Sequence, residues 1–230
     1  MMGASEFARV VLLTPDDLIR MLHLQLYISM HVPAGFFRAK SERDLYAYLD
    51  GSAGAAFGVV QKDQLIATAL LRIPSETNPN SGMPFPHVPA ADWPLHAAFL
   101  ENAMVHPSAR GQGFQRLLLE ARFSHAAEHG MRWVCAGVHL NNAVSWSNLL
   151  AQGMLIAGLR LDLGYPVLGL LGTLNPHGLP VNLADQIRVA GYDQRQHQTA
   201  LQNGYVGARL APEGAVVYQR LLSAGAQAAE

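Results

Sequence analysis

The stretch VHPSARGQGFQRLLLEARF, residues 105–123, places an arginine and two glycines between an extended segment and an amphipathic one. This order predicts main-chain N–H groups exposed at the start of a helix, and such an end attracts anions. Gly111 and Gly113 let the backbone approach a phosphate closely, and Arg110 adds a charge-assisted contact. The joint therefore predicts either a phosphate site or a simple turn.

The loop differs from two common nucleotide-binding fingerprints. No Gly-Lys-Ser/Thr follows the glycines, so it is not a Walker loop. The third glycine of the dinucleotide fingerprint is missing, and no acidic residue stands about 20 residues later at the end of a strand. The neighbouring elements must therefore decide what the loop holds.

Composition limits the partners. A chain of 230 residues, half of them hydrophobic, can bury a full core, so we expect one large domain or one domain with a small appendage. Only 14% of the residues are charged, and the net charge of −1 offers no basic surface for a polyanion. We expect no nucleic-acid partner.

Cys135 is the single cysteine, which excludes an intrachain disulfide and a cysteine-based zinc cluster. The N-terminus lacks the pattern of a secretory signal. The longest mostly apolar stretch, 165–174, is about ten residues long and too short to span a bilayer. We therefore expect a cytoplasmic protein with no membrane partner. We also expect no metal, because no pair of histidines is expected to share a helix face.

Hydrophobic periodicity predicts the elements that position the loop. Thr14-Pro15 begins a helix, Ser41 begins a second one, and two apolar runs around Lys62-Asp63 predict a hairpin. The expected strands are 7–13, 55–61, 65–73, 99–105, 133–138, 155–163 and 167–174, and the expected helices are 15–30, 41–50, 112–129 and 142–152.

These elements predict an α/β fold with a mixed, mostly antiparallel central sheet of about seven strands flanked by helices. We expect one domain over residues 7–174. Residues 175–230 are expected to form a small C-terminal α/β extension, with a helix begun by Asp193 and two strands at 205–210 and 216–222.

Six prolines between Pro74 and Pro94 predict a long loop. It either packs on the sheet as a surface excursion or covers a substrate as a lid.

Together, the loop and its neighbours resemble the GNAT superfamily, the Gcn5-related N-acetyltransferases, which have the acyl-CoA N-acyltransferase fold. The resemblance is carried by Val105-x-Pro107, by Arg110-Gly-Gln-Gly113, by the leucines at 117–119, by Asn142-x-x-Ser145 and by Gly153-Met154. It covers the order of elements from about residue 7 to residue 174.

The resemblance implies that acetyl-CoA, or another short acyl-CoA, is the co-substrate. The pantetheine arm would contact the main chain of Ala103, Met104 and Val105. The pyrophosphate would bind Arg110, Gly111, Gln112, Gly113, Phe114, Gln115 and Arg116. Asn142 would lie near the thiol end and Ser145 would reach the same arm. The structural alternatives are helix capping for Asn142 and packing for Ser145.

Acyl transfer needs a group that removes a proton from the attacking amine, which is mostly protonated at neutral pH. Strand alternation places Glu101 on the same face as Phe99 and Val105, and Glu101 is our first candidate base. His139 is the second. A salt-bridged carboxylate and a packed, hydrogen-bonded histidine are the structural alternatives for these two residues.

Three hypotheses follow. The first is an acyl-CoA-dependent N-acyltransferase that moves an acetyl or short acyl group to a small-molecule amine by direct attack in a ternary complex, with the 74–97 loop shaping the acceptor pocket. The second is a non-catalytic acyl-CoA-binding or sensing module, because Phe99 and Leu149 stand where the family often has catalytic groups. The third makes 175–230 an oligomerisation element, and a homodimer stays open.

Overall fold

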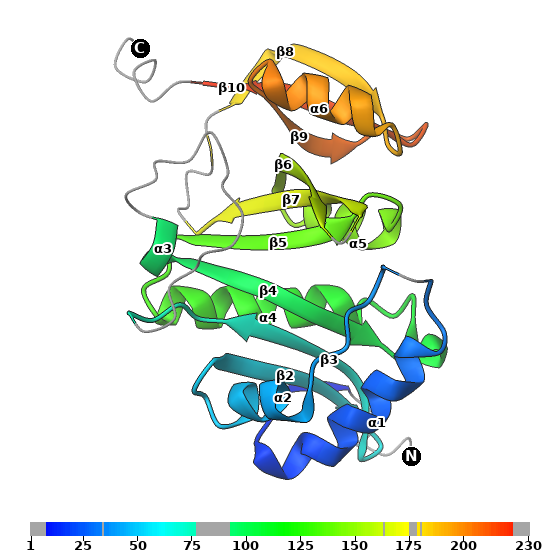
Figure 1. The fold of residues 1–230 in the computed structure, drawn as a ribbon, viewed down its shortest axis with the longest axis vertical. Coiled ribbons are helices and arrows are strands. Elements are labelled where there is room, and N and C mark those ends of the chain that lie inside the picture. Colours follow the sequence, from blue (N-terminus) through cyan, green and yellow to red (C-terminus); the bar gives the residue numbers. More distant parts are fainter. Residues whose placement is uncertain are drawn as a thin grey trace, which may run out of the picture. The chain divides into compact units, whose positions relative to one another are not determined.

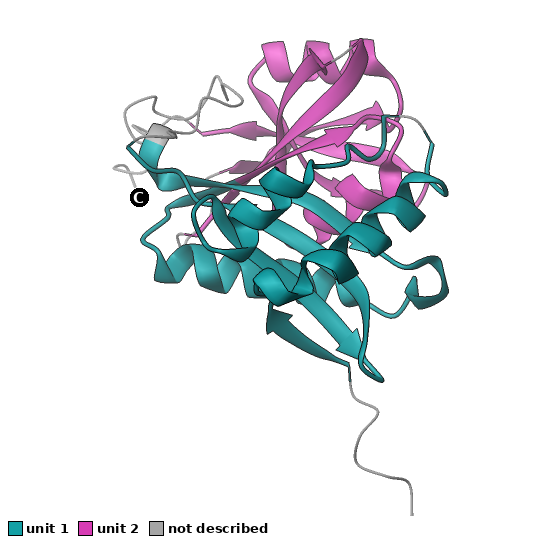
Figure 2. Ribbon diagram, turned by 60° about the horizontal axis from the view of Figure 1, so that its bottom comes forward, with its two compact units in different colours: residues 1–80, 94–134 teal, residues 81–93, 135–230 magenta. Residues whose placement is uncertain are grey.

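The computed structural model describes residues 8–33, 35–76, 93–162, 164–174, 179 and 181–222. Contacts divide the chain into two compact units, residues 1–80 with 94–134 and residues 81–93 with 135–230 (Figure 2). The loop predicted around Pro74–Pro94 lies largely outside the described residues. Among the residues described, no helix is long and apolar enough to cross a membrane.

Unit 1 contains an antiparallel sheet with the order β1-β2-β3-β4 (Figure 1). The strands are β1 (Arg9–Leu12), β2 (Gly54–Gln61), β3 (Gln64–Arg72) and β4 (Ala97–Val105). Lys62 and Asp63 have φ of 49° and 60°, which are the left-handed values that a two-residue hairpin turn requires. The hairpin predicted at these residues is confirmed.

The helical elements of unit 1 are η1 (Pro15–Asp17), α1 (Leu18–Ser29), α2 (Glu42–Leu49), α3 (Trp93–His96), η3 (Pro107–Ala109) and α4 (Phe114–Glu128). Ser41 starts α2 as predicted, because its Oγ accepts a hydrogen bond from the main-chain N–H of Asp44 at 3.1 Å.

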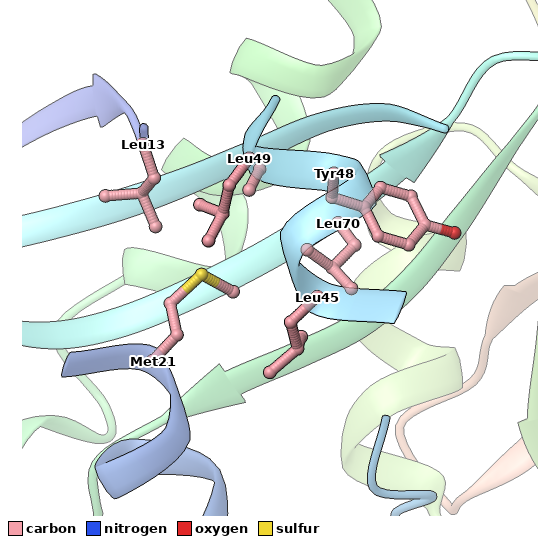
Figure 3. Packing of buried hydrophobic residues seen from close by; sticks show 7 residues of the cluster. Leu13, Met21, Leu45, Tyr48, Leu49 and Leu70 are labelled. Atoms are coloured by element: carbon pink, nitrogen blue, oxygen red, sulfur yellow. The ribbon is translucent and has the colours of Figure 1, made fainter. Parts of the chain in front are cut away.

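A hydrophobic cluster holds α1 and α2 against one face of the sheet. Its buried members are Leu13, Met21, Leu45, Tyr48, Leu49, Ala56 and Leu70 (Figure 3). Phe57 is next to Ala56 on β2 and therefore points to the other face, where its ring contacts that of His125 on α4. Helices thus cover both faces, as the sequence predicts.

Unit 2 has the strand order β5-β7-β6-β9-β10-β8. Its elements are β5 (Trp133–His139), α5 (Ala143–Ala151), β6 (Leu155–Asp162), β7 (Tyr165–Thr173), β8 (Val181–Ala190), α6 (Gln194–Gln202), β9 (Tyr205–Leu210) and β10 (Ala215–Leu221).

The structure corrects the expected number of strands, because its described residues form ten strands rather than about seven. Seven of them, β1 to β7, match the predicted ones. The other three come from the C-terminal segment, where β9 and β10 match the strands predicted at 205–210 and 216–222 and β8 was not predicted. Strand β9 pairs antiparallel with β6 through Gly207 and Ile156. A Cβ on Gly207 would lie 3.0 Å from the Cβ of Ile156, so glycine permits this close pairing. The domain boundary at residue 174 stays a prediction.

A buried histidine fixes α6 to the sheet of unit 2. His197 is 0% exposed, its Nδ1 lies 2.7 Å from the hydroxyl of Tyr218 on β10, and its Nε2 lies 3.1 Å from the carbonyl of Gly191. A carbonyl only accepts, so Nε2 carries the proton and Nδ1 accepts from the tyrosine. Burial lowers the pKa of His197. Its ring is therefore a neutral, fully hydrogen-bonded part of the core.

Candidate functional site

The loop between β4 and α4 adopts a conformation that depends on its two glycines. Gly111 and Gly113 have φ of 78° and 80°, in the left-handed region where side chains are strained. Apart from the adjacent residues in the chain, no described atom lies within 4 Å of where a Cβ would stand on either glycine. The glycines are therefore required by the backbone conformation, and the space above them is open.

This loop presents a row of main-chain donors. The N–H groups of residues 111–114 find no acceptor within the described part of the chain. Residues 110–113 are exposed, whereas the side chain of Phe114 is buried and anchors the first turn of α4. The N–H groups of Arg110 and Arg116 are already used, because they donate to the carbonyls of Pro107 and Gly113. Four consecutive donors thus remain at the start of the helix.

Electrostatics also favours an anion here. The first turn of α4, which the structure describes in full, contains no acidic residue, so the positive end of the helix dipole is not compensated there. The exposed side chain of Arg110 precedes it. Arg116 lies on the helix surface with its Nε 3.5 Å from Glu120 Oε1. The geometry and charge suit an anion with several oxygens, such as a diphosphate.

The strand that leads into the loop contains a β-bulge. Thr68 pairs with Met104 and Leu70 pairs with Glu101, so β4 has one extra residue between them. Asn102 has φ of 43°, and its Nδ2 donates to the carbonyl of Arg38 at 3.0 Å. The bulge re-aims the main chain immediately before Ala103, where the pantetheine contacts are predicted.

The bulge overturns one detail of the sequence prediction. Glu101 pairs with Leu70 and Met104 with Thr68, so both point to the α1 and α2 face, whereas Val105 pairs with Ala67 on the opposite face. Simple alternation wrongly placed Glu101 and Val105 together. The buried Met104 packs against Leu24 and Ile28 of α1, which agrees with this assignment.

Glu101 lies in a charged cluster that the sequence did not reveal. Its carboxylate contacts Lys40 Nζ, lies 3.5 Å from Arg72 Nε, and accepts a hydrogen bond of 2.9 Å from the hydroxyl of Tyr48. Burial, reinforced by the negative charge of Glu101, raises the pKa of Tyr48, which keeps the hydroxyl protonated as a donor. The salt-bridged arrangement is present, and the role of Glu101 as a base stays a prediction.

The remaining predicted residues lie together where β5 ends and α5 begins, in unit 2. His139 is 9% exposed, and its Nδ1 accepts from the N–H of Asn141 at 3.0 Å. Asn142 caps α5, because its Oδ1 accepts from the N–H of Ser145 at 3.3 Å. Capping uses only the carbonyl oxygen of this amide. The predicted contacts of Asn142 and Ser145 with acyl-CoA stay predictions.

One pair of histidines contradicts the expectation that no two share a helix face. His125 and His129 lie one turn apart on α4 and just beyond its end, with ring centroids 4.1 Å apart. The spacing His-x-x-x-His was visible in the sequence at residues 125–129. Among the described residues, no group of three or more His, Cys, Asp or Glu side chains is placed to hold a metal.

Comparison with known proteins identifies the family. Residues 24–153 match the acetyltransferase (GNAT) family, which is more than half of the chain. No curated protein matches the chain.

Solved structures share the fold. The Salmonella typhimurium protein yncA, solved with its cofactor acetyl-CoA, has a TM-score of 0.57 at 16% identity and covers 76% of this chain and 98% of its own. The ribosomal-protein-S18-alanine N-acetyltransferase of Escherichia coli has a TM-score of 0.54 at 18% identity, covering 72% and 92%. The diaminobutyrate acetyltransferase of Paenibacillus lautus, in complex with its substrate and coenzyme A, has a TM-score of 0.52 at 14% identity, covering 72% and 95%.

The solved structures, at these identities, establish the likeness of fold, and the family match covers more than half of the sequence. The protein therefore belongs to the GNAT family of acetyltransferases.

Proposed function

We propose that the protein transfers an acetyl or other short acyl group from acyl-CoA to a small-molecule amine, by direct attack in a ternary complex. The observation that supports this most is the row of N–H donors at residues 111–114, which have no acceptor among the described residues and lie next to the exposed Arg110, in a chain of the GNAT family. We place the reaction in the cytoplasm, with no nucleic acid or membrane as a partner.

The donors at 111–114 would hold the pyrophosphate of acyl-CoA, with the side chains of Arg110 and Arg116 adding positive charge. The main chain of residues 103–105, just after the bulge, would contact the pantetheine arm. Asn142 and Ser145 would contact the same arm nearer its thiol end, with the Nδ2 of Asn142 not needed for the helix cap. Bound acyl-CoA supplies a thioester carbonyl as the electrophile.

The transfer needs one proton removed and one delivered. The amine nitrogen forms a bond to the carbonyl carbon, the carbon–sulfur bond breaks, and the departing sulfur takes up a proton as free thiol. Glu101 is the candidate that removes the proton from the amine, directly or through water, and His139 is the second candidate.

A second function is a non-catalytic acyl-CoA-binding or sensing module. It is favoured by Leu149, which is 5% exposed and stands where many family members carry a tyrosine that protonates the thiolate. It is also favoured by the three polar partners that already occupy the Glu101 carboxylate.

Replacing Glu101 with glutamine separates the two functions. The enzyme should first release free thiol from acetyl-CoA when supplied with pools of small amines. Glu101→Gln should then lower the turnover by about 100-fold or more, because it removes the general base. Calorimetry should find its affinity for coenzyme A unchanged.

Glu42→Gln is the matched control, because Glu42 is an exposed carboxylate in the first turn of α2. It should keep the wild-type turnover. Coenzyme A binding without thiol release by the wild-type protein would favour the sensing module. A wild-type protein that binds no coenzyme A would overturn both functions.

A further inference from the structure

The C-terminal end of α4 carries two histidines that no step above uses. Their ring centroids lie 4.1 Å apart with the planes tilted by 32°. Residues four apart on a helix project to the same side, so both imidazoles can reach one atom placed beside the helix. Two neighbouring imidazoles at this spacing are a recurring pair of ligands for transition metals.

The hydrogen bonding of His129 prepares it as a ligand. Its Nδ1 lies 2.8 Å from the main-chain carbonyl of His125. A carbonyl oxygen only accepts, so Nδ1 carries the proton and the lone pair of the neutral ring is on Nε2. Metal-binding histidines typically donate their other N–H to a carbonyl or carboxylate, which fixes the ring and its tautomer. The hydrogen bond that orients a metal-binding histidine is therefore already present at His129.

His125 is held in place by packing. Its ring meets that of Phe57 edge to face, with centroids 5.4 Å apart and an interplanar angle of 79°. His125 is half-buried and His129 is exposed, so the pair is fixed on one side and open to solvent on the other. An ion can therefore reach the pair without any rearrangement of the core.

The local field also favours a cation. The pair lies at the C-terminal end of α4, which is the negative end of the helix dipole. Glu128 lies between the two histidines in sequence and accepts a hydrogen bond from Ser124 Oγ at 3.0 Å. Its carboxylate adds negative charge to the same turn.

We propose that His125 and His129 form a two-histidine site for a divalent transition metal ion that prefers imidazole, such as Cu²⁺, Ni²⁺ or Zn²⁺. Water or another exogenous ligand completes the coordination, because the described residues contain no group of three ligands. Helix α4 is 15 residues, or about 22 Å, long. The proposed metal site is thus at the opposite end of this helix from the 110–116 loop, and it stands independently of the proposed acyl transfer.

The test is a titration of the full-length, tag-free protein with each metal ion alone, followed by calorimetry. The affinity should follow the order Mn²⁺ weakest, then Ni²⁺, then Cu²⁺, as nitrogen ligands dictate. His125→Gln and His129→Gln should each weaken Ni²⁺ binding by about tenfold or more, because each leaves one imidazole. His23→Gln, on α1, is the matched control and should bind as the wild type does.

A second measurement keeps the test independent of any change in stability. Cu²⁺ should broaden the amide NMR signals of the last turn of α4 in the wild type and in His23→Gln, and not in His129→Gln. His129 is exposed, so its replacement should leave the fold intact. The proposal is overturned if either single variant binds Ni²⁺ as tightly as the wild type, if Mn²⁺ binds as tightly as Cu²⁺, or if the broadening maps elsewhere.

Discussion

The polar groups at the start of α4 and those of the C-terminal strands are treated in opposite ways. In the loop, four consecutive main-chain donors at 111–114 have no acceptor among the described residues. In the C-terminal part of unit 2, the Asp185 carboxylate accepts from Tyr205 and Arg220, and Arg220 also donates to the carbonyl of Asn203. His197 is likewise bonded through both ring nitrogens.

This difference indicates which polar groups support the fold and which are available to bind a ligand. A polar group that supports the fold is matched by a protein partner, since a buried unmatched group costs about 1–3 kcal/mol. A group that binds a ligand is left open at the surface, where water satisfies it until the ligand arrives. The open donors at the start of α4 fit the proposed binding of an anion, whereas the hydrogen-bonded side chains near α6 stabilise the fold.

The largest expected effect is a loss of coenzyme A affinity when the main-chain N–H groups of residues 111–114 are moved out of position. Gly113→Val places a branched side chain on a residue with φ of 80°, so the loop must change its conformation. We expect the affinity for coenzyme A to fall by more than about 100-fold, because several of the charge-assisted hydrogen bonds to the diphosphate are lost together. Calorimetry measures this directly.

Gly130→Val is the matched control. Gly130 has φ of 70° and, like Gly113, has no described atom within 4 Å of the Cβ position, but it follows the C-terminal end of α4. Both variants should lose a similar free energy of unfolding, roughly 1–2 kcal/mol. An equal loss of coenzyme A affinity in the two variants would mean that backbone strain, and not the anion site, is responsible.

Removing the hydrogen bonds of His197 should lower the stability of the fold and leave the affinity for coenzyme A unchanged. His197→Phe leaves the Tyr218 hydroxyl and the Gly191 carbonyl buried without their partner, and should lower the free energy of unfolding by about 3 kcal/mol. Tyr218→Phe removes a single hydroxyl and should cost about 1 kcal/mol. Urea titrations measure both losses. If the folded variants keep the affinity for coenzyme A, the hydrogen bonds of His197 serve the fold and not ligand binding. A loss of affinity would contradict this distinction.

The fold could be predicted largely from local signals. The turn residues Lys62 and Asp63, the cap at Ser41 and the glycines of the loop each specify their own conformation, and the structure follows them. The strand β8 was missed because, between Val181 and Ala190, only Val189 is buried. Without a regular alternation of buried and exposed residues, its sequence does not indicate a strand.

The geometry of the candidate site was predictable only where its residues are consecutive. The loop at 110–116 carries its pattern in its own sequence. The bulge at Asn102 depends on the register with β3, and a single sequence shows no register. The partners of Glu101 come from residues 40, 48 and 72, on segments that meet only in the folded chain. Local patterns therefore could not show that this carboxylate is paired.

The last expected effect, similar in size to that of Tyr218→Phe, is a dependence of stability on pH that comes from His197. Burial lowers the pKa of His197 in the folded chain, although Gly191 and Asp193 oppose this shift. The unfolded chain has a histidine pKa of about 6.5 and takes up a proton first as the pH falls. The stabilisation by neutral His197 is therefore complete above about pH 6.5 and is lost progressively below it, by at most about 1.4 kcal/mol per pH unit.

Unfolding free energies at pH 7.5 and pH 5.5 measure this loss in the wild type and in His197→Phe. The window lies above the pKa of ordinary carboxylates, and the other histidines are common to both proteins, so the difference between them isolates His197. The wild type should lose up to about 1.4 kcal/mol more than the variant, as a single histidine that stays neutral in the folded state requires. Equal losses in the two proteins would mean that His197 is protonated as readily in the folded chain as in the unfolded one. Its ring would then not be held neutral by burial, and the contrast with the loop would fail.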